Sequence, residues 1–316
     1  MNSKYLSLDP LIPWRHEDRP IHWASKFGRE APLEVEIGFG LGDFLVRQAR
    51  ENPRKDYVGI ELGWVTVRRT LRKIALAGVS NVRILLLDAR VAFERLFCQK
   101  SLNAVYALFP FPWPKKRHVK HRFFSHGFFK LMNSRLLDHG EALIVTDYQP
   151  YLQWILSQVS GTGLEAFLQA IPPQFQTKYE RKWQSHGQRR FYQLRLIKRH
   201  HIAIPLKEDI VLLIHRVENF EPEGFVLQDH RGDIIVEFRE VIYDPKQKKS
   251  LVSSVVKEEN FLQTFWIEIA EDDRGWRIRP AKGCGIIPTL GAQRALDLVR
   301  EAVVHSTSSI KMSGKK

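Results

Sequence analysis

A short apolar stretch that runs into three alternating glycines constrains the fold of this chain more than any other feature. The stretch reads VEIGFGLGDFL over residues 35–45, and its glycines are Gly38, Gly40 and Gly42. Glycine permits positive φ and brings bare backbone close to a ligand, while the first turn of a helix leaves N–H groups unpaired. The pattern predicts the first strand, loop and helix of a nucleotide-type α/β domain.

The charges around these glycines indicate which ligand the loop suits. A dinucleotide-binding loop has a third glycine close to a pyrophosphate, but Asp43 occupies that position here and Glu36 precedes the first glycine. Two carboxylates would repel phosphates, which disfavours a nucleotide-dependent oxidoreductase. They suit S-adenosylmethionine, which carries a sulfonium and an amine. A plain turn between a core strand and a helix is the alternative interpretation.

Two further carboxylates follow predicted strands. The second strand ends in Glu61, which follows Gly40 by about 20 residues, the interval at which this type of fold places an acid on ribose hydroxyls. The third strand ends in Asp88-Ala89, where an acid can accept a hydrogen bond from the adenine amino group. We expect both acids to join Glu36 around one site. A glutamate that only caps a helix is the alternative for Glu61.

The most unusual stretch is FPFPWPKKRHVKHRFF, residues 109–124. Its alternating prolines are expected to hold the chain extended and to forbid a helix, so that Phe111 and Trp113 are displayed. Seven basic side chains follow within eight positions, from Lys115 to Arg122. Aromatic rings beside dense cations predict a surface that stacks a base and neutralises phosphates. A stiff loop whose rings pack on the protein is the alternative, although it does not explain the cations.

The net charge also indicates a polyanionic partner for one part of the chain. The net charge is +14, from 49 Lys and Arg against 35 Asp and Glu. Residues 1–200 hold 32 of these cations and 17 of the acids, so the entire excess lies in the first two-thirds of the chain. A second polar and basic stretch, residues 177–190, is expected to be a loop at the same edge of the sheet. This distribution is typical of nucleic-acid binding.

Composition excludes several classes of protein. No stretch of about 18 apolar residues predicts a membrane span, and the N-terminus lacks the apolar run of a secretion signal. Cys98 and Cys284 lie far apart, and the twelve histidines form no ligand pattern, so no metal site is predicted. We expect a cytoplasmic protein with reduced cysteines.

Six short motifs resemble, in their order, those of the bacterial tRNA (guanine-N7)-methyltransferases. The resemblance covers roughly residues 30–200, and its most specific parts are the proline-tryptophan loop and the T-K-aromatic-E stretch. The motifs are EIGFGLG (36–42), GIE (59–61), DA (88–89), FPFPWPKKRH (109–118), TDYQPY (146–151) and TKYE (177–180).

The resemblance implies a Rossmann-like class I methyltransferase with a seven-stranded mixed sheet. It further implies transfer of a methyl group from S-adenosylmethionine to N7 of a guanosine in the tRNA variable loop. We expect an irregular N-terminal segment (1–30), the methyltransferase domain (31–200) and a small C-terminal α+β domain of unknown role (205–316). The expected partner is tRNA, with no membrane, and monomer and homodimer both stay open.

The resemblance and the charge pattern together assign roles to individual residues. The cofactor-binding residues are expected to be Glu36, Gly38, Gly40, Gly42, Glu61, Asp88 and Ala89. The substrate-binding residues are expected to be Lys115, Asp147, Thr177, Lys178, Tyr179 and Glu180. The RNA backbone is expected to contact Lys116, Arg117, Lys120 and Arg122. The catalytic positions are Asp147 and Phe111.

Phe111 departs from the family pattern. The family's loop usually reads F-P-D-P-W, and its middle Asp is regarded as the catalytic, cofactor-contacting carboxylate. Guanine N7 has a free lone pair and no proton, so its methylation needs no general base. One lost carboxylate contact costs about 2–4 kcal/mol, whereas positioning supplies about 7–11 kcal/mol.

We therefore expect a slow enzyme. In this hypothesis Phe111 stacks on the cofactor or the guanine, and Asp147 or Glu180 alone orients the substrate. The alternative is a catalytically weak or inactive tRNA-binding protein of the same fold.

Overall fold

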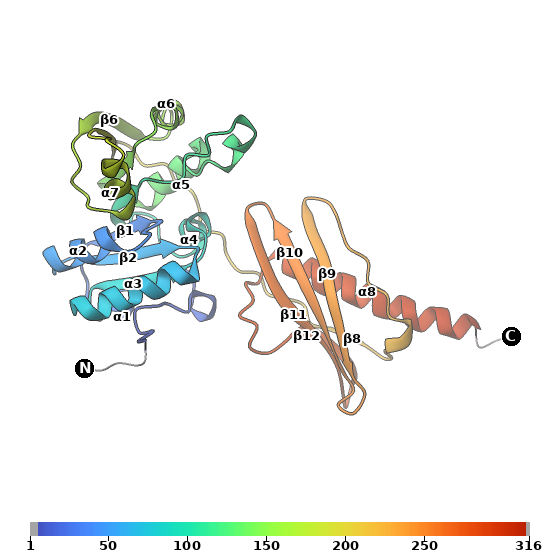
Figure 1. Cartoon of the computed structure of the whole chain (residues 1–316). Helices are drawn as coiled ribbons and strands as arrows, with labels where there is room; N and C mark the ends of the chain where they lie inside the picture. Colours follow the sequence, from blue (N-terminus) through green and yellow to red (C-terminus); the bar gives the residue numbers. More distant parts are fainter. Residues whose placement is uncertain (1–5, 314–316) are drawn as a thin grey trace. The chain divides into compact units, whose positions relative to one another are not determined.

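The computed structural model describes the backbone of residues 6–313 and the side chains of residues 6–306. The first five residues of the predicted N-terminal segment therefore lie outside the described residues. The chain forms two compact units, residues 1–207 and residues 208–316. Each unit has its own sheet and its own buried core (Figure 1).

The first unit is built on a seven-stranded mixed sheet in the order β3-β2-β1-β4-β5-β7-β6. Strands β1 to β5 are parallel, and β7 runs antiparallel between β5 and β6. The predicted seven-stranded sheet is thereby confirmed. The strands are β1 Leu33–Ile37, β2 Asp56–Glu61, β3 Val82–Leu86, β4 Leu102–Leu108, β5 Leu136–Thr146, β6 Leu164–Ile171 and β7 Phe191–Lys198.

Helices connect the strands of this sheet. In α3, the apolar side chains of Val67, Leu71 and Ile74 recur at helical spacing and are buried, and Gly78 ends the helix in the left-handed conformation. The same spacing of apolar residues is visible in the sequence of residues 64–77. The helices of the first unit are α1 Trp23–Phe27, α2 Asp43–Glu51, α3 Trp64–Ala77, α4 Ala89–Arg95, α5 His126–Arg135, α6 Gln149–Ser157 and α7 Lys178–Ser185, with short 3-10 helices η1 Trp14–His16 and η2 Lys116–His121.

Helix α7 was not predicted from the sequence, since residues 177–190 were expected to form a loop. The helix begins because Thr177 caps it, with the Thr177 hydroxyl accepting a hydrogen bond from the backbone N–H of Glu180. Helix α7 lacks the buried apolar residues whose spacing predicts a helix, because Glu180 is its only buried residue.

A strap without regular structure, residues 199–207, ends the first unit. The fully buried guanidinium of Arg135 donates to the carbonyls of Phe93 (2.7 Å) and Ile204 (2.7 Å). The side chain of Asn133 accepts from the backbone N–H of Ile202 at 2.9 Å, and the backbone N–H of Lys207 donates to helix α4. These bonds hold the strap against α4 and α5.

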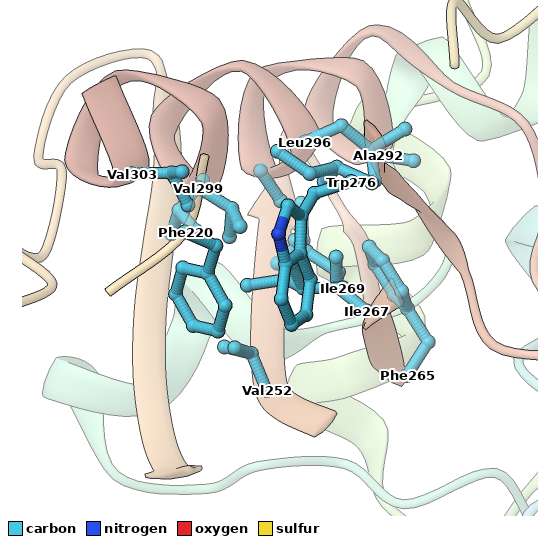
Figure 2. Close-up of a cluster of buried hydrophobic side chains, with 14 residues drawn as sticks. Phe220, Val252, Phe265, Ile267, Ile269, Trp276, Ala292, Leu296, Val299 and Val303 are labelled. Carbon is cyan, nitrogen blue, oxygen red and sulfur yellow. The ribbon is translucent and has the colours of Figure 1, made fainter. Parts of the chain in front are cut away.

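The second unit is an antiparallel sheet with one long helix, which confirms the predicted C-terminal α+β domain. Helix α8 packs its Leu296, Val299 and Val303 against a cluster that includes Trp276 and Phe220 (Figure 2). The sheet order is β8-β12-β11-β10-β9. The elements are β8 His215–Val217, η3 Pro222–Gly224, β9 Ile234–Asp244, β10 Lys249–Glu258, β11 Phe261–Asp272, β12 Gly275–Pro280 and α8 Leu290–Ser313. Within residues 6–313, no helix has the length and apolar character needed to span a bilayer.

Candidate active site

A cavity of about 150 Å³ lies at the carboxyl ends of β1 and β4, the point at which the strand order reverses. Open α/β sheets bind ligands at this switch point. Four segments line the cavity: the end of β1 with its glycine loop, the first turns of α3, the end of β4, and the residues at the start of α7. The side chains of Glu36, Thr66, Arg69, Phe109 and Tyr179 belong to this lining.

The glycine loop leaves open space in front of its backbone. Gly38 and Gly40 have φ values of 69° and 54°, and a Cβ at either position would meet no atom within 4 Å. Gly42 has a different function, because a Cβ there would lie 2.4 Å from the side chain of Thr70 in α3. Gly38 and Gly40 therefore leave their backbone open to a ligand, and Gly42 allows α2 to pack closely on α3.

Glu36 is the uncompensated acid of the cavity. It is 3% exposed, and its Oε2 has no hydrogen-bond partner among the described residues. Burial, reinforced by the charges of Asp43 and Glu61, raises the pKa of Glu36 to about 8. A buried carboxylate oxygen without a donor is costly. The position therefore favours a cationic or hydrogen-donating ligand group.

Glu61 ties the glycine loop to the start of α3. Its Oε1 accepts from the backbone N–H of Leu62 at 2.9 Å, and its Oε2 accepts from that of Gly40 at 3.3 Å. A third bond comes from Gly63 at 3.4 Å. A carboxylate offers about four acceptor sites, so one is left for a ligand. Glu61 therefore caps the start of α3, as the alternative interpretation predicted, and keeps one acceptor site for a ligand.

Asp88 lies beside Glu61 along the same edge of the sheet. The backbone N–H of Leu87 donates to the carbonyl of Glu61 at 3.1 Å, and Asp88 caps α4 by accepting from Arg90 at 2.7 Å. Ala89 follows in the first turn of α4. Neither Glu61 nor Asp88 lines the cavity. Because ligand pockets usually measure about 300–1,000 Å³, the enclosed cavity would hold only part of a nucleoside-containing cofactor.

Asp43 is neutralised by two cations. Its carboxylate pairs with Lys73 of α3 and, at 3.0 Å, with Arg181 of α7. Both Glu36 and Asp43 were expected to act as carboxylates facing the ligand beside the glycines, but of these two only Glu36 has an oxygen without a partner among the described residues. The ion pair with Arg181 joins α7 to the helix that follows the glycine loop.

The proline-rich stretch is less extended than predicted. Phe109 and Trp113 have φ values of 56° and 44°, so the chain turns at both residues. The turn at Phe109 keeps its backbone N–H bonded to the carbonyl of Val145 at 2.8 Å and buries its ring against Phe191. The expectation of a uniformly extended stretch is therefore wrong at these two positions. The basic residues beyond it form η2.

We call residues 109–122 the basic ledge. Phe111 is 65% exposed, with its ring edge-on to Trp113 at 4.8 Å. Arg122 is directed inward, since it donates to the carbonyl of Pro112 at 3.0 Å and its guanidinium lies over the Trp154 ring. The other cations predicted to contact RNA or substrate are exposed, namely Lys115, Lys116, Arg117 and Lys120.

The T-K-Y-E motif, residues 177–180, forms the start of helix α7. Glu180 is 1% exposed and accepts from the backbone N–H groups of Gln174 (2.8 Å), Phe175 (3.1 Å) and Gln176. Together with the Thr177 cap, this arrangement resembles the capping box S/T-x-x-E, a signal that was present in the sequence. The carboxylate of Glu180 is thus already occupied by backbone N–H groups of residues 174–176.

Asp147 follows β5 next to the end of β4. Val145 is paired with Leu108, so Asp147 lies beyond the strand that borders the cavity. Burial raises the pKa of the Asp147 carboxyl, and the charge of Lys182 in α7 partly offsets this effect. Asp147, Phe111 and Lys115 do not line the cavity itself.

Comparison with known proteins gives the family. A family model described as a putative methyltransferase matches residues 30–193. A tRNA (guanine-N(7)-)-methyltransferase of Chlorobium phaeobacteroides is 42% identical over 170 residues, which cover 54% of this chain and 83% of that protein. The chain belongs to the tRNA (guanine-N(7)-)-methyltransferase family. The predicted family is confirmed, and the chain is a methyltransferase that uses S-adenosylmethionine.

Two relatives also match beyond the first unit. The tRNA (guanine-N(7)-)-methyltransferases of Thermotoga maritima and Aquifex aeolicus are each 30% identical to this chain, over 284 and 281 residues. These matches cover 86% and 85% of this chain, and 90% and 93% of the relatives. Because the first unit holds only 207 of the 316 residues, both matches include part of the second unit.

The residues present fit the cofactor of this family. The unpartnered Oε2 of Glu36 suits its cationic end, and the open cradle at Gly38 and Gly40 suits close approach of its chain. Thr66 and Arg69 are among the lining residues that were not predicted from the sequence. The available signal was their i, i+3 spacing in the first turns of the helix after Glu61.

Proposed function

We propose that this chain transfers a methyl group from S-adenosylmethionine to N7 of a guanosine in the variable loop of tRNA. Membership of the family supports this proposal. The observation that carries it is the buried, unpartnered oxygen of Glu36 in a glycine-lined cavity at the switch point of the sheet.

Each cofactor-binding residue has a distinct part in the proposal. Glu36 holds the cationic end of the cofactor, and the remaining acceptor site of Glu61 holds a ribose hydroxyl. Asp88 accepts from the adenine amino group, with Ala89 beside it. When bound, S-adenosylmethionine supplies a methyl group on a sulfonium sulfur, and this sulfur is a good leaving group because it departs as a neutral thioether.

The chain's residues act by orienting the purine. Guanine N7 has an in-plane lone pair and no proton, so no side chain has to remove one. The methylated purine carries a positive charge, which the carboxylate of Asp147 stabilises. Lys178 and Tyr179 of α7 line the cavity, and in this proposal they also bind the guanosine.

The basic ledge binds the tRNA backbone in this proposal. Lys115 and the exposed cations Lys116, Arg117 and Lys120 neutralise phosphates, while Arg122 positions the ledge from within. The exposed ring of Phe111 stacks on a base. We further propose that the protein acts in the cytoplasm, because tRNA is its proposed substrate.

The test uses the full-length protein, an unmodified tRNA transcript and labelled S-adenosylmethionine. We expect label in the tRNA and chain cleavage specific to 7-methylguanosine in the variable loop. A transcript with adenosine at that guanosine should take up no label. Label at another base would overturn the proposed position, and cofactor binding without any label would favour the weak or inactive binding protein.

A further inference from the structure

The start of α3 exposes apolar side chains beside the candidate active site. Leu62 is 68% exposed, Trp64 43% and Val65 57%. All three come directly after Glu61, the acid that ties α3 to the glycine loop. An exposed apolar cluster of this kind marks an interaction site more often than isolated surface leucines do.

Three arginines without partners continue from this cluster along α3. Arg68, Arg69 and Arg72 are exposed, and within the described part of the chain none has an ion pair or a side-chain hydrogen bond. In the same helix Lys73, by contrast, is paired with Asp43. The face therefore combines apolar surface with uncompensated positive charge.

Helical spacing aligns these groups. Trp64, Arg68 and Arg72 follow one another at intervals of four residues, which places them in one row along α3. Arg69 and Thr66 line the cavity, so the row borders the candidate active site. The row follows β2 and the basic ledge follows β4, and these strands flank β1 on either side.

We propose that Leu62, Trp64, Val65, Arg68 and Arg72 form a second contact surface for tRNA, across the glycine loop from the basic ledge. The proposal rests on the proposed function. The Trp64 ring stacks on an unpaired base and the arginines neutralise adjacent phosphates. The uncompensated arginines favour this polyanion, because its regularly spaced phosphates supply the counter-charges that the arginines lack within the described residues.

The experiment compares substitutions in the full-length protein by tRNA affinity, measured at several salt concentrations without cofactor. Arg68→Glu/Arg72→Glu should weaken binding by tenfold or more and lower the slope of log affinity against log salt by about 2, roughly 1 for each phosphate contact. Trp64→Ala should weaken binding by about tenfold, and Trp64→Phe should restore most of it. Arg69 is left unchanged because it lines the cavity.

The matched control is Arg50→Glu/Arg54→Glu. Both arginines are exposed, and they lie at the end of α2 and in the loop before β2, at the opposite edge of the sheet. We expect this variant to bind tRNA with a modest, at most twofold, loss. All variants should keep the cofactor affinity and the thermal midpoint of the natural protein.

Several results would overturn the inference. If the natural protein methylates tRNA but the α3 variants keep its affinity and salt slope, the surface does not bind RNA. If Trp64→Ala dissociates a dimer in sedimentation without changing tRNA affinity, the surface is a protein interface. If the natural protein neither binds nor methylates tRNA, the proposed function fails, and this inference fails with it.

Discussion

At the scale of the residue, Glu36 couples the stability of the free protein to pH. Its folded-state pKa is about 8, against a usual value of 4.5, because burial disfavours the carboxylate. The folded state therefore holds a proton that the unfolded chain has lost between these two values. Stability contributed by this group is present below pH 4.5 and decreases as the pH rises toward 8.

Glu36→Gln tests this linkage. The amide keeps the shape of the side chain but does not titrate, so the unfolding free energy should depend less on pH between about 5 and 8 than in the natural protein. Urea unfolding at a series of pH values measures this. Since the amide also lacks the charge for the cationic cofactor, calorimetry should show weaker cofactor binding. An unchanged pH profile would contradict the assignment.

A second prediction at this scale concerns Phe111, which occupies the family's carboxylate position. Phe111→Asp should raise the single-turnover rate of methylation, with a gain of up to about 10³-fold if the carboxylate acts as one electrostatic contact. Phe111→Asn is the control, because asparagine has nearly the same size as aspartate but carries no charge. A gain above a thousandfold would mean that the natural sequence is close to inactive, and no gain would mean that positioning suffices.

At the scale of the element, α7 closes one side of the cavity through a network of local and distant bonds. Glu180 satisfies three backbone N–H groups of residues 174–176, and Arg181 pairs with Asp43. The pair involves a half-exposed arginine, so its own contribution is small. The buried Glu180 network holds the segment in place, because its removal would leave backbone donors unpaired.

Glu180→Ala is therefore expected to loosen α7. Hydrogen exchange over residues 174–185 should become faster, and the KM for tRNA should rise more than the kcat falls, since the guanosine-binding residues Lys178 and Tyr179 lose their support. Thr177→Ala should have a smaller effect, near the 1 kcal/mol of a lost helix cap. Gln184→Ala, on the exposed side of the same helix, is the control and should change neither quantity. Equal effects of all three variants would contradict this role.

At the scale of the whole molecule, the boundary of the first unit is set by the strap. Arg135 and Asn133 lie in α5, and both have hydrogen-bond partners among residues 200–205. The strap therefore belongs to the first unit although it forms no strand or helix. Figure 1 shows the second unit as a separate sheet with α8, and its core is made of its own side chains.

Two truncations test this boundary. A chain ending at residue 207 should fold with a cooperative thermal transition. A chain ending at residue 198 loses two of the acceptors of the buried Arg135, the carbonyls of Ile204 and Pro205. It should be less stable by about 3 kcal/mol or more, since each hydrogen bond to a charged group contributes roughly 1.5–3 kcal/mol. Denaturant unfolding measures the difference. Equal stability would show that the strap does not support the first unit.

The local pattern of the sequence was sufficient for much of this architecture. The strand and glycines of residues 35–42, the helix over residues 64–77 and the family motifs could all be recognised without coordinates. They are encoded by hydrophobic periodicity and by backbone requirements of glycine, which act over a few residues. The acids after β1, β2 and β3 were predictable for the same reason, because parallel strands end at one edge of a sheet.

Only the tertiary structure decided which of these charged groups are available to a ligand. Asp43 is neutralised by Lys73 and Arg181, and Arg122 is directed inward by its bond to Pro112. Backbone N–H groups already occupy Glu180, whereas Glu36 has an oxygen without a partner among the side chains of residues 6–306. The reason is physical: a charge is cancelled by whatever lies within a few ångströms of it, and Asp43 and Arg181 are 138 residues apart in the chain. The sequence determined the residue types and their local frame, and the packing of distant elements determined which side chains face the cavity uncompensated.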